Sequence, residues 1–498
     1  FPSNEHIAPE VIAHPDYLYV SHLHRDHFDR EFLRENVSRA ATVLLPAFPV
    51  PDLRRELASL GFARFEVLPD RDPLDLDGLS VMGVLEVSTS DGPLGDSALA
   101  VDDGSARLLN QNDARPRNLE AIRGFGPYDA HFLQFSGAIW YPVVYEMGAR
   151  AKAELGREKR VRGMDRALRF AQDVGARFVF PSAGPPCFLD DSLFAHNDFD
   201  CDESNPFPDQ TVLLDYLSTH DTGGGRLLVP GSVVTLSSGG CELSHPAPDE
   251  QALAPFTDKR AYLEAYQARC RPAIQAARDA WPSGEADPAL GGDVVGILQE
   301  WWEPLLAMAD HICSGVGEPV LLQAGELAVV LDFPARQVRA HDGEACSYSF
   351  DFEPGPFLAS VADRCEDWVN GLFLSMRFTA QREGPYNEHI YAFFKCLSVE
   401  RMAWAENRAG AGAALSAPGE ASSRRHRSPE DGWCQIDGWR IQRYCPHLQA
   451  DLSVFGCVED GVLSCQLHGW QFDLATGQCL TSEGSHQIKA ERLVDTDL

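Results

Sequence analysis

The chain has no long apolar run and a deficit of positive charge. No stretch approaches the eighteen or so consecutive apolar residues of a transmembrane helix, so we expect no membrane span. It carries 42 Lys+Arg against 74 Asp+Glu, a net charge of -32, which argues against nucleic acid or an anionic membrane surface as a partner. The first residues do not resemble a signal peptide, and we expect a soluble, cytoplasmic protein.

The chain also lacks internal repeats and a paired set of cysteines. Thirteen cysteines, an odd number, are scattered through 498 residues, which favours reduced thiols over a disulfide framework. Ordinary apolar content and plentiful aromatic residues indicate a globular protein, and the length predicts two to four domains. Arginine far outnumbers lysine, as is typical of a high-GC actinobacterium.

The most specific motif lies near the C-terminus, where Cys445 and His447 are followed, after seventeen residues, by Cys465 and His468. Two thiolates and two imidazoles on two short loops can hold the two irons of a [2Fe–2S] cluster. The same ligand types would permit a structural zinc site, but zinc fingers usually place two cysteines before two histidines. The pattern resembles the Rieske [2Fe–2S] domain.

Some Rieske domains carry a further pair of cysteines that bridges the two loops. Those positions hold Ala450 and Leu467, so no bridge is expected, and the domain resembles the lower-potential oxygenase type.

A second motif lies near the N-terminus, between an expected strand over Tyr17–Val20 and an expected helix over Phe28–Asn36. Three imidazoles and a carboxylate within six positions can converge on one or two metal ions. These residues are His22, His24, Asp26 and His27. The order His-x-His-x-Asp-His resembles the motif of the metallo-β-lactamase fold.

Further ligands are expected along the chain. No histidine occurs between His27 and His131, so a mid-domain position that is often a histidine in that fold is taken by Asp91 or by nothing. Asp113 follows an apolar strand, where the fold usually has a bridging ligand, although an Asx-turn is the alternative. His196 is the candidate for a late ligand, with a surface histidine equally open.

The resemblance predicts an α/β αββα sandwich with an α+β middle module and a small all-β Rieske domain. Few residues precede His22, so we expect the first strands of the sandwich to be missing. The expected parts are 1–250, the metallo-β-lactamase-like iron domain; 251–405, the middle module; 406–430, a flexible linker; and 431–498, the Rieske domain.

The middle module is expected to be helical from Pro356 to Trp404. Its charged residues Arg377 and Arg382 are expected to be structural or exposed, and the aromatic loop 134–142 either lines a pocket or packs in the core. The aromatic residues expected in the core of the module are Trp368, Phe373, Phe378, Phe393 and Phe394.

The two motifs constrain each other. A [2Fe–2S] cluster passes single electrons, so its partner site should consume electrons, as an iron site that activates O₂ does. The combination resembles the nucleotide-sugar N-acetyl hydroxylases. The strings 21–29, 112–116, 136–142, 181–188 and 445–451, with the Rieske domain last, are similar to the actinobacterial UDP-N-acetylmuramic acid hydroxylases.

That resemblance implies hydroxylation of the N-acetyl methyl of UDP-N-acetylmuramic acid (UDP-MurNAc), a peptidoglycan precursor. It implies O₂ as co-substrate and electrons from NAD(P)H through a reductase or ferredoxin. Because the expected linker would let the cluster dock on a neighbouring subunit, we also expect a homo-oligomer. One or two non-haem irons would be held by the N-terminal motif with Asp113, and Arg115 and Arg117 would contact the substrate. A CMP-sialate-type N-acetyl hydroxylase and a metal-dependent hydrolase with a redox-sensing Rieske domain are the alternatives.

Overall fold

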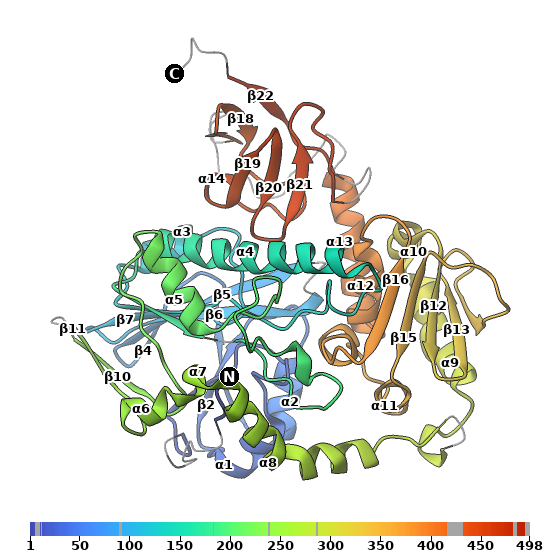
Figure 1. The fold of residues 1–498 in the computed structure, drawn as a ribbon, viewed down its shortest axis with the longest axis horizontal. Helices are drawn as coiled ribbons and strands as arrows, with labels where there is room; N and C mark the ends of the chain where they lie inside the picture. The colour runs from blue at the N-terminus through green and yellow to red at the C-terminus, as the bar shows by residue number, and fades with distance from the viewer. Residues whose placement is uncertain are drawn as a thin grey trace.

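A computed structural model of the chain describes residues 1–4, 10, 12–88, 92–182, 184–237, 240–284, 287–415, 432–481 and 486–493. Figure 1 shows three parts: a blue-to-green sandwich, a yellow-to-orange module beside it, and a small red domain of short strands. The red domain rests on the long helix α4 (Ala149–Val174) of the sandwich. In the described ranges, no helix is long and apolar enough to cross a membrane.

The sandwich contains two sheets. The first is parallel, with the order β1-β2-β3, and the second has the order β4-β5-β6-β7-β8-β9, antiparallel up to β7 and parallel from there. The strands are β1 (Tyr17–Tyr19), β2 (Thr42–Pro46), β3 (Arg64–Leu68), β4 (Leu74–Leu76), β5 (Leu79–Ser88), β6 (Gly92–Asp102), β7 (Arg107–Asn110), β8 (Ala130–Gln134) and β9 (Phe178–Ser182).

Apolar side chains bury both faces of these sheets. Leu44 and Leu68 of the first sheet pack against Val81 and Leu99 of the second. One set of helices covers the outer face of the first sheet and another covers the second. They are α1 (Arg30–Asn36) and α2 (Asp52–Ser59), then α3 (Glu120–Phe125), α4 and α5 (Gln210–Thr219). This order of helix, sheet, sheet and helix confirms the predicted αββα sandwich.

Helix α4 supports the rest of the molecule. It ends at Gly175, whose φ of 62° is a left-handed conformation that glycine adopts without steric cost. Met164 and Leu168 face the core of the sandwich, whereas the ring of Phe170 packs on Phe455 of the C-terminal domain, 5.2 Å between ring centroids. One helix therefore joins two cores.

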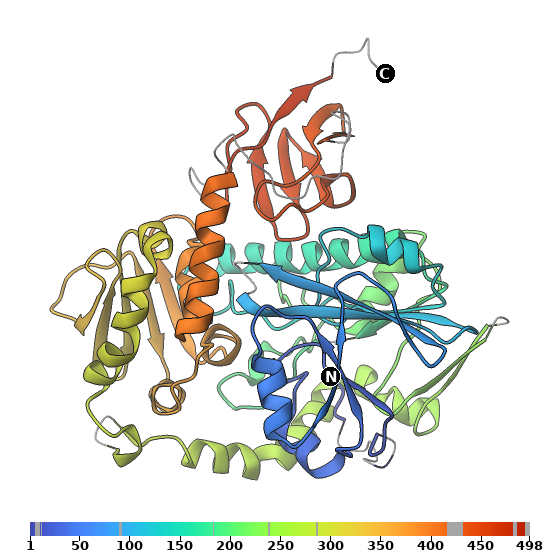
Figure 2. The same ribbon diagram turned by 180° about the vertical axis from the view of Figure 1, so that it is seen from behind.

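A connecting region leads from the sandwich to the middle module. It contains a hairpin and a helix that runs beneath the sandwich in Figures 1 and 2. Its elements are η2 (Phe194–His196), β10 (Val233–Ser237), β11 (Gly240–Ser244), α6 (Asp249–Ala252), α7 (Ala254–Thr257), α8 (Lys259–Asp279) and η3 (Pro288–Leu290).

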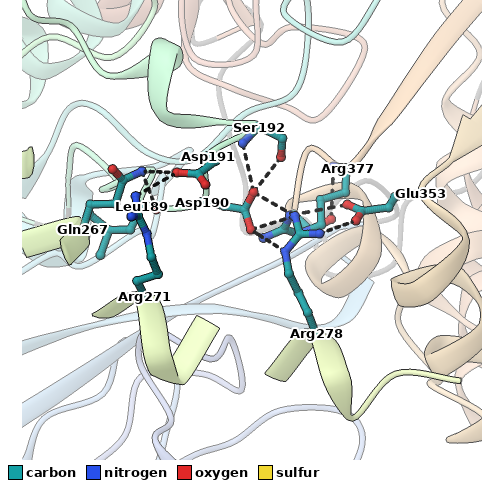
Figure 3. A network of polar contacts seen from close by, with 10 residues as sticks. Leu189, Asp190, Asp191, Ser192, Gln267, Arg271, Arg278, Glu353 and Arg377 are labelled. Carbon is teal, nitrogen blue, oxygen red and sulfur yellow. Dashed lines mark hydrogen bonds and ion pairs between the residues drawn. The ribbon is translucent and has the colours of Figure 1, made fainter. Parts of the chain in front are cut away.

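A partly buried ion-pair network fastens this helix to both neighbours, as Figure 3 shows. Arg278 of α8 donates to Asp190 of the sandwich at 2.8 Å and to Glu353 of the middle module at 2.9 Å. Arg377 of the middle module lies 3.2 Å from Asp190 and 3.4 Å from Glu353. Arg377 therefore has a structural role, one of the two roles expected for it from the sequence.

The middle module is built on a five-stranded sheet with the order β14-β13-β12-β15-β16. The strands are β12 (Pro319–Ala324), β13 (Leu327–Asp332), β14 (Gln337–Ala340), β15 (Tyr348–Phe352) and β16 (Phe378–Arg382). The helical elements are α9 (Val294–Met308), α10 (Asp310–Val316), α11 (Pro354–Ala362), η4 (Val369–Phe373), α12 (Glu388–Lys395) and α13 (Val399–Leu415).

Two expectations for this module are tested. The five aromatic side chains expected in its core are all buried: Trp368, Phe373, Phe378, Phe393 and Phe394. The continuous helical stretch expected over 356–404 is wrong, because β16 interrupts it and pairs antiparallel with β15, Ala380 opposite Phe350.

The C-terminal domain has two small antiparallel sheets, β17-β18-β22 and β19-β20-β21. Its elements are β17 (Trp433–Ile436), β18 (Trp439–Gln442), α14 (Leu452–Phe455), β19 (Gly456–Glu459), β20 (Val462–Cys465), β21 (Trp470–Asp473) and β22 (Ala490–Arg492). The linker expected over 406–430 needs correction, because helix α13 continues to Leu415. The remainder of that linker lies outside the described residues.

Candidate metal centres

The N-terminal motif follows β1 and turns into α1 within a few residues. His22 is fully buried, and its Nε2 lies 2.8 Å from Nδ1 of His24 and 3.4 Å from Oδ1 of Asp96. Nε2 of His27 lies 3.5 Å from Oδ1 of Asp113. Two groups with a common member could therefore hold a metal ion: His22, His27 and Asp113, and His22, His24 and Asp96.

Asp96 is the ligand candidate that the sequence did not reveal. It lies in the middle of β6, opposite Glu86 of β5, and reaches the motif only because the sheet carries β6 past the end of β1. The only signal was a carboxylate in a strand of small and apolar residues, in the region where a ligand was expected. Asp91, the residue suggested for that role, lies outside the described residues.

Two predicted ligands stand apart from these groups. The side chain of Asp26 is 75% exposed, and its Oδ2 lies 3.6 Å from Nε2 of His27 without joining either group. His196 lies in η2 with its ring against Phe188, 5.8 Å between centroids, and belongs to neither group. The structure therefore places the ring of His196 against Phe188 and away from both groups, and its role as a late ligand stays a prediction.

Hydrogen bonds from one serine orient the imidazoles. Oγ of Ser21 lies 3.0 Å from Nδ1 of His22 and 3.4 Å from Nδ1 of His27. Its own carbonyl accepts a bond of 2.7 Å from the hydroxyl of Ser97, next to Asp96. Because Nδ1 of His22 is engaged with Ser21, only its Nε2 is free to bind a metal. A single ring nitrogen binds a single ion, so His22 cannot serve both groups at once. The arrangement favours a single metal ion, although two groups of ligands are present.

The electrostatics of the group suit a cation. Burial lowers the pKa of His22 to about 4, which keeps its ring neutral and able to donate a lone pair. Although burial acts against it, the three neighbouring imidazoles hold the pKa of Asp113 below its usual value. The buried Oδ1 of Asp113 accepts no hydrogen bond within the described ranges. A mixed histidine and carboxylate set with an unsatisfied oxygen fits non-haem iron.

The C-terminal motif forms a second centre, between β18 and α14 and between β20 and β21. Cys445 and Cys465 are fully buried, with their thiols in hydrogen-bonding contact. The rings of His447 and His468 lie 5.4 Å apart between centroids, and neither buried Nδ1 has a hydrogen-bond partner among the described residues. Two thiols and two unsatisfied imidazole nitrogens fit a [2Fe–2S] cluster, which they would bind through Sγ and Nδ1.

The far side of the His447 ring reaches another part of the molecule. The ring stacks on Trp470, 4.0 Å between centroids, and its Nε2 lies 3.4 Å from Oε2 of Glu388 in α12. Although burial acts to raise it, the contact with His447 holds the pKa of Glu388 below its usual value. The middle module therefore presents a carboxylate to the second centre.

One short loop joins the two centres. Asp113 belongs to the first group, and Arg117 donates to the carbonyl of Leu448 at 3.2 Å, next to His447. The carbonyl of Arg117 accepts a bond of 3.3 Å from the amide of Asp451. Four peptide units span at most about 14 Å between the Cα atoms of Asp113 and Arg117, so one short segment of the chain contacts both centres.

Helix α12 makes a second connection. Glu388 at its start contacts His447, and Lys395 at its end packs against Gly92 at the start of β6. Burial lowers the pKa of His24, Asp367 opposes this shift, and Lys395 adds to it. Seven helical residues span about 10 Å, so the helix and the loop run between the same two sites.

The two arginines expected to bind substrate differ. Arg117 also donates to Glu86 at 2.9 Å, so its guanidinium is used in joining the sandwich to the C-terminal domain. Its assignment as a substrate contact stays a prediction, while the structure gives it this joining role. Arg115, by contrast, has no ion pair within the described parts of the chain and points to a cavity between the three parts.

Comparisons with known proteins follow the same division. Residues 294–410 match the family described as Rv3818-like, SCP2-like domain, and residues 440–491 match the Rieske [2Fe-2S] domain. The chain is 46% identical to the Rieske 2Fe-2S iron-sulfur protein Rv3818 of Mycobacterium tuberculosis, over 99% of this chain and 93% of that protein. It is 44% identical to a Rieske 2Fe-2S iron-sulfur protein of Mycolicibacterium smegmatis, over the same shares.

Solved structures with a distant likeness cover less than half of the chain. CmlA, a diiron beta-hydroxylase from Streptomyces venezuelae, is 16% identical with a TM-score of 0.27, covering 43% of this chain and 44% of its own. Igni18, a metallo hydrolase from Ignicoccus hospitalis, is 14% identical with a TM-score of 0.29, covering 47% and 80%.

Proposed function

The chain belongs to the family of Rv3818-like Rieske 2Fe-2S iron-sulfur proteins, and we propose that it is an iron-dependent monooxygenase that hydroxylates the N-acetyl methyl group of UDP-MurNAc. The observation that carries the proposal is the loop from Asp113 to Arg117. It contributes a carboxylate to the histidine site and, four residues later, contacts the loop of the [2Fe–2S] site. A hydrolytic site has no use for an electron source that shares a loop with it.

The reaction consumes O₂, two electrons and two protons, and it yields the hydroxymethyl product and water. When bound, the cluster supplies single electrons and a non-haem iron with open coordination positions activates O₂. The proposed iron ligands are His22, His24, His27, Asp96 and Asp113. The proposed cluster ligands are Cys445, His447, Cys465 and His468.

The other residues of the site orient the metal ligands and exclude water. Ser21 holds the rings of His22 and His27 by their outer nitrogens, and Ser97 holds Ser21 in turn. Burial of His22 and the closely packed sheets keep water from that side of the site. Glu388 and Arg117 keep the first cluster loop against the middle module and the sandwich.

The assignment of UDP-MurNAc as the substrate rests on the resemblance of the sequence to the UDP-N-acetylmuramic acid hydroxylases. The product would be the N-glycolyl form of the peptidoglycan precursor. A ferredoxin or an NAD(P)H-dependent reductase would supply the electrons. The C-terminal domain docks on α4 of its own chain, where Arg169 donates to the carbonyl of Val454 at 2.8 Å. Electron transfer therefore needs no second subunit, and the homo-oligomer remains a prediction that light scattering can check.

The test uses the full chain, reconstituted without oxygen and loaded with iron and cluster. After reduction, exposure to ¹⁸O₂ should increase the mass of UDP-MurNAc by one labelled oxygen atom. A fully loaded protein that leaves the mass unchanged would contradict the proposal. Turnover in the absence of O₂, with cleavage of the substrate, would identify a hydrolase instead.

A further inference from the structure

A cavity of about 570 Å³ lies where the three parts of the molecule meet. The sandwich contributes Arg115 and Lys159 to its wall, the middle module contributes Arg382, and the C-terminal domain contributes His447 and His468. No part forms this cavity alone, and both histidines of the cluster site face it. A charged ligand in this cavity would therefore lie next to the cluster and affect its redox state.

The cavity is positively charged, although the chain as a whole is acidic. Its lining contains two carboxylates, and both are engaged: Glu158 with Arg162 at 3.2 Å, and Glu388 with His447 at 3.4 Å. Four basic side chains line the same space: Arg115, Lys159, Arg162 and Arg382. Positive charge is therefore in excess at this point.

Two of these cations approach one aromatic ring from different parts of the fold. Nζ of Lys159 lies 5.4 Å and Cζ of Arg382 lies 5.2 Å from the centroid of Tyr141. Neither has a carboxylate partner among the described residues, and Arg115 has none either. Burial and the guanidinium groups around it lower the pKa of Lys159 to about 8. An anion between these groups would relieve the repulsion.

The geometry favours a phosphate-bearing ligand. Guanidinium groups bind phosphate oxygens in pairs, and a lysine adds a point charge. Trp140 lines the same cavity, is only half-buried and offers apolar surface to the ring of a nucleoside. For the aromatic loop 134–142 a pocket and core packing were both open. Ile139, Trp140 and Tyr141 line the cavity, whereas Phe135 is buried in the core.

We propose that this cavity binds the diphosphate of a nucleotide through Arg115, Lys159 and Arg382, and that its occupancy is coupled to the redox state of the Rieske cluster. The first part, binding of the diphosphate, rests on the proposed function, since it locates the UDP part of the proposed substrate in this cavity. The second follows from the histidines in the wall, because a bound anion favours the oxidised cluster, which carries less negative charge than the reduced one. The anion should then bind the oxidised protein more tightly and lower the midpoint potential.

The experiment measures binding of UDP to the anaerobic, cluster-loaded full chain by calorimetry. The wild type should bind UDP, pyrophosphate should compete, and uridine, which has no phosphate, should not. Lys159→Gln and Arg382→Gln should each weaken binding at least tenfold. Arg157→Gln is the matched control, because Arg157 lies on the same helix but pairs with Glu154 at 2.8 Å outside the cavity.

The coupling is tested by a redox titration with and without UDP. A tenfold weaker affinity for the reduced protein corresponds to a potential lower by about 59 mV for a one-electron couple. A potential that saturating UDP leaves unchanged would overturn the coupling. Binding that is absent in the wild type, or equal in wild type and both folded variants, would overturn the site.

These outcomes are independent of catalysis. If the cavity is assigned wrongly, UDP-MurNAc still gains oxygen, and Lys159→Gln has the KM of the wild type. If the proposed reaction is wrong, UDP still binds in the cavity and shifts the potential, but UDP-MurNAc gains no oxygen. Circular dichroism shows whether each variant is folded, and Arg382→Lys should recover part of the lost affinity.

Discussion

The two metal centres are built in different ways. The histidine and carboxylate site collects ligands from the loop after β1, from the middle of β6 and from the end of β7, all within the sandwich. The cluster site takes its ligands from two loops of one small domain, but the ring of His447 extends to Glu388 of another module. The first site is supported by its own domain, and the second is supported by its neighbours.

The outer nitrogens of the imidazoles show the same contrast. Nδ1 of His22 is held by Ser21, the adjacent residue in the chain. Nε2 of His447 is held by a carboxylate that comes from a separate fold. Changes at the first site should therefore affect metal binding alone, whereas changes around the second should affect the potential of the cluster and its communication with the first.

The largest effects should come from removing a ligand from each centre. His22→Ala should lower product formation by more than about 100-fold, because loss of a metal ligand costs more than loss of a residue that only hydrogen-bonds to a ligand. Its cluster should keep the electron paramagnetic resonance spectrum of the wild type. Cys465→Ser should show the reverse, with the cluster lost and the other iron retained. Iron analysis and spectroscopy check both, and loss of both metals from either variant would contradict two independent centres.

Two aspartate variants compare the ligands that the structure brings together with the ligands expected from the sequence motif. Asp96→Asn should lower iron binding and product formation by roughly 10- to 100-fold, because Asp96 faces His22 and His24. Asp26→Asn should cost at most a few-fold, because its carboxylate is largely exposed. Iron stoichiometry and turnover measure the difference. Equal losses in the two variants would restore Asp26 as a ligand and remove the special role of Asp96.

The link between the modules is tested with a charge-neutral variant. Glu388→Gln should raise the midpoint potential of the cluster, because a carboxylate next to His447 favours the oxidised state. Glu400→Gln is the control, since Glu400 is exposed and pairs with Arg55. Redox titration of both proteins measures whether the Glu388 carboxylate changes the midpoint potential of the cluster. If Glu388→Gln and Glu400→Gln share the wild-type potential, the carboxylate has no electrostatic role.

The smallest effect should be a pH dependence of UDP binding. Burial lowers the pKa of Lys159 to about 8, helped by Arg162 and Arg166 on its own helix and by Arg115 on the loop after β7, and Glu158 opposes the shift. The charged form binds the anion, so affinity should be full below pH 8 and fall as the pH rises through that value. An ordinary lysine would keep its charge to about pH 10. Calorimetry between pH 7 and 9 measures the trend, which should be absent in Lys159→Gln.

Much of the candidate chemistry was predictable because it is local. The cluster ligands and the N-terminal histidines occupy short motifs, and Asp113 was expected from its place at the end of an apolar strand. Asp96 was not predicted, because its role depends on which strand lies beside β1 and not on any spacing along the chain. Asp26 and His196 were predicted as ligands from their position in the sequence. The structure leaves the Asp26 carboxylate beside His27 but largely exposed, and it places the His196 ring against Phe188.

The secondary structure shows the same limit. The strand after Asp16 was predicted closely, because a β-rich run is a local signal. Strand β16 was predicted as helix, since a short apolar run fits either state until a partner strand is present. Helix α13 runs past the expected boundary because the stretch up to Leu415 is rich in alanine, which favours helix over linker.

The sequence by itself determined the types of metal site, the acidic character of the chain and the presence of a Rieske domain, because these depend on residue identity and short spacing. Only the tertiary structure decided that the two centres lie next to each other. Docking of the C-terminal domain on α4 and α12 brings Arg117 and Glu388 to the cluster loop, and it forms a basic cavity from three separate segments. Contacts between residues hundreds of positions apart arise from packing, and no local pattern encodes them.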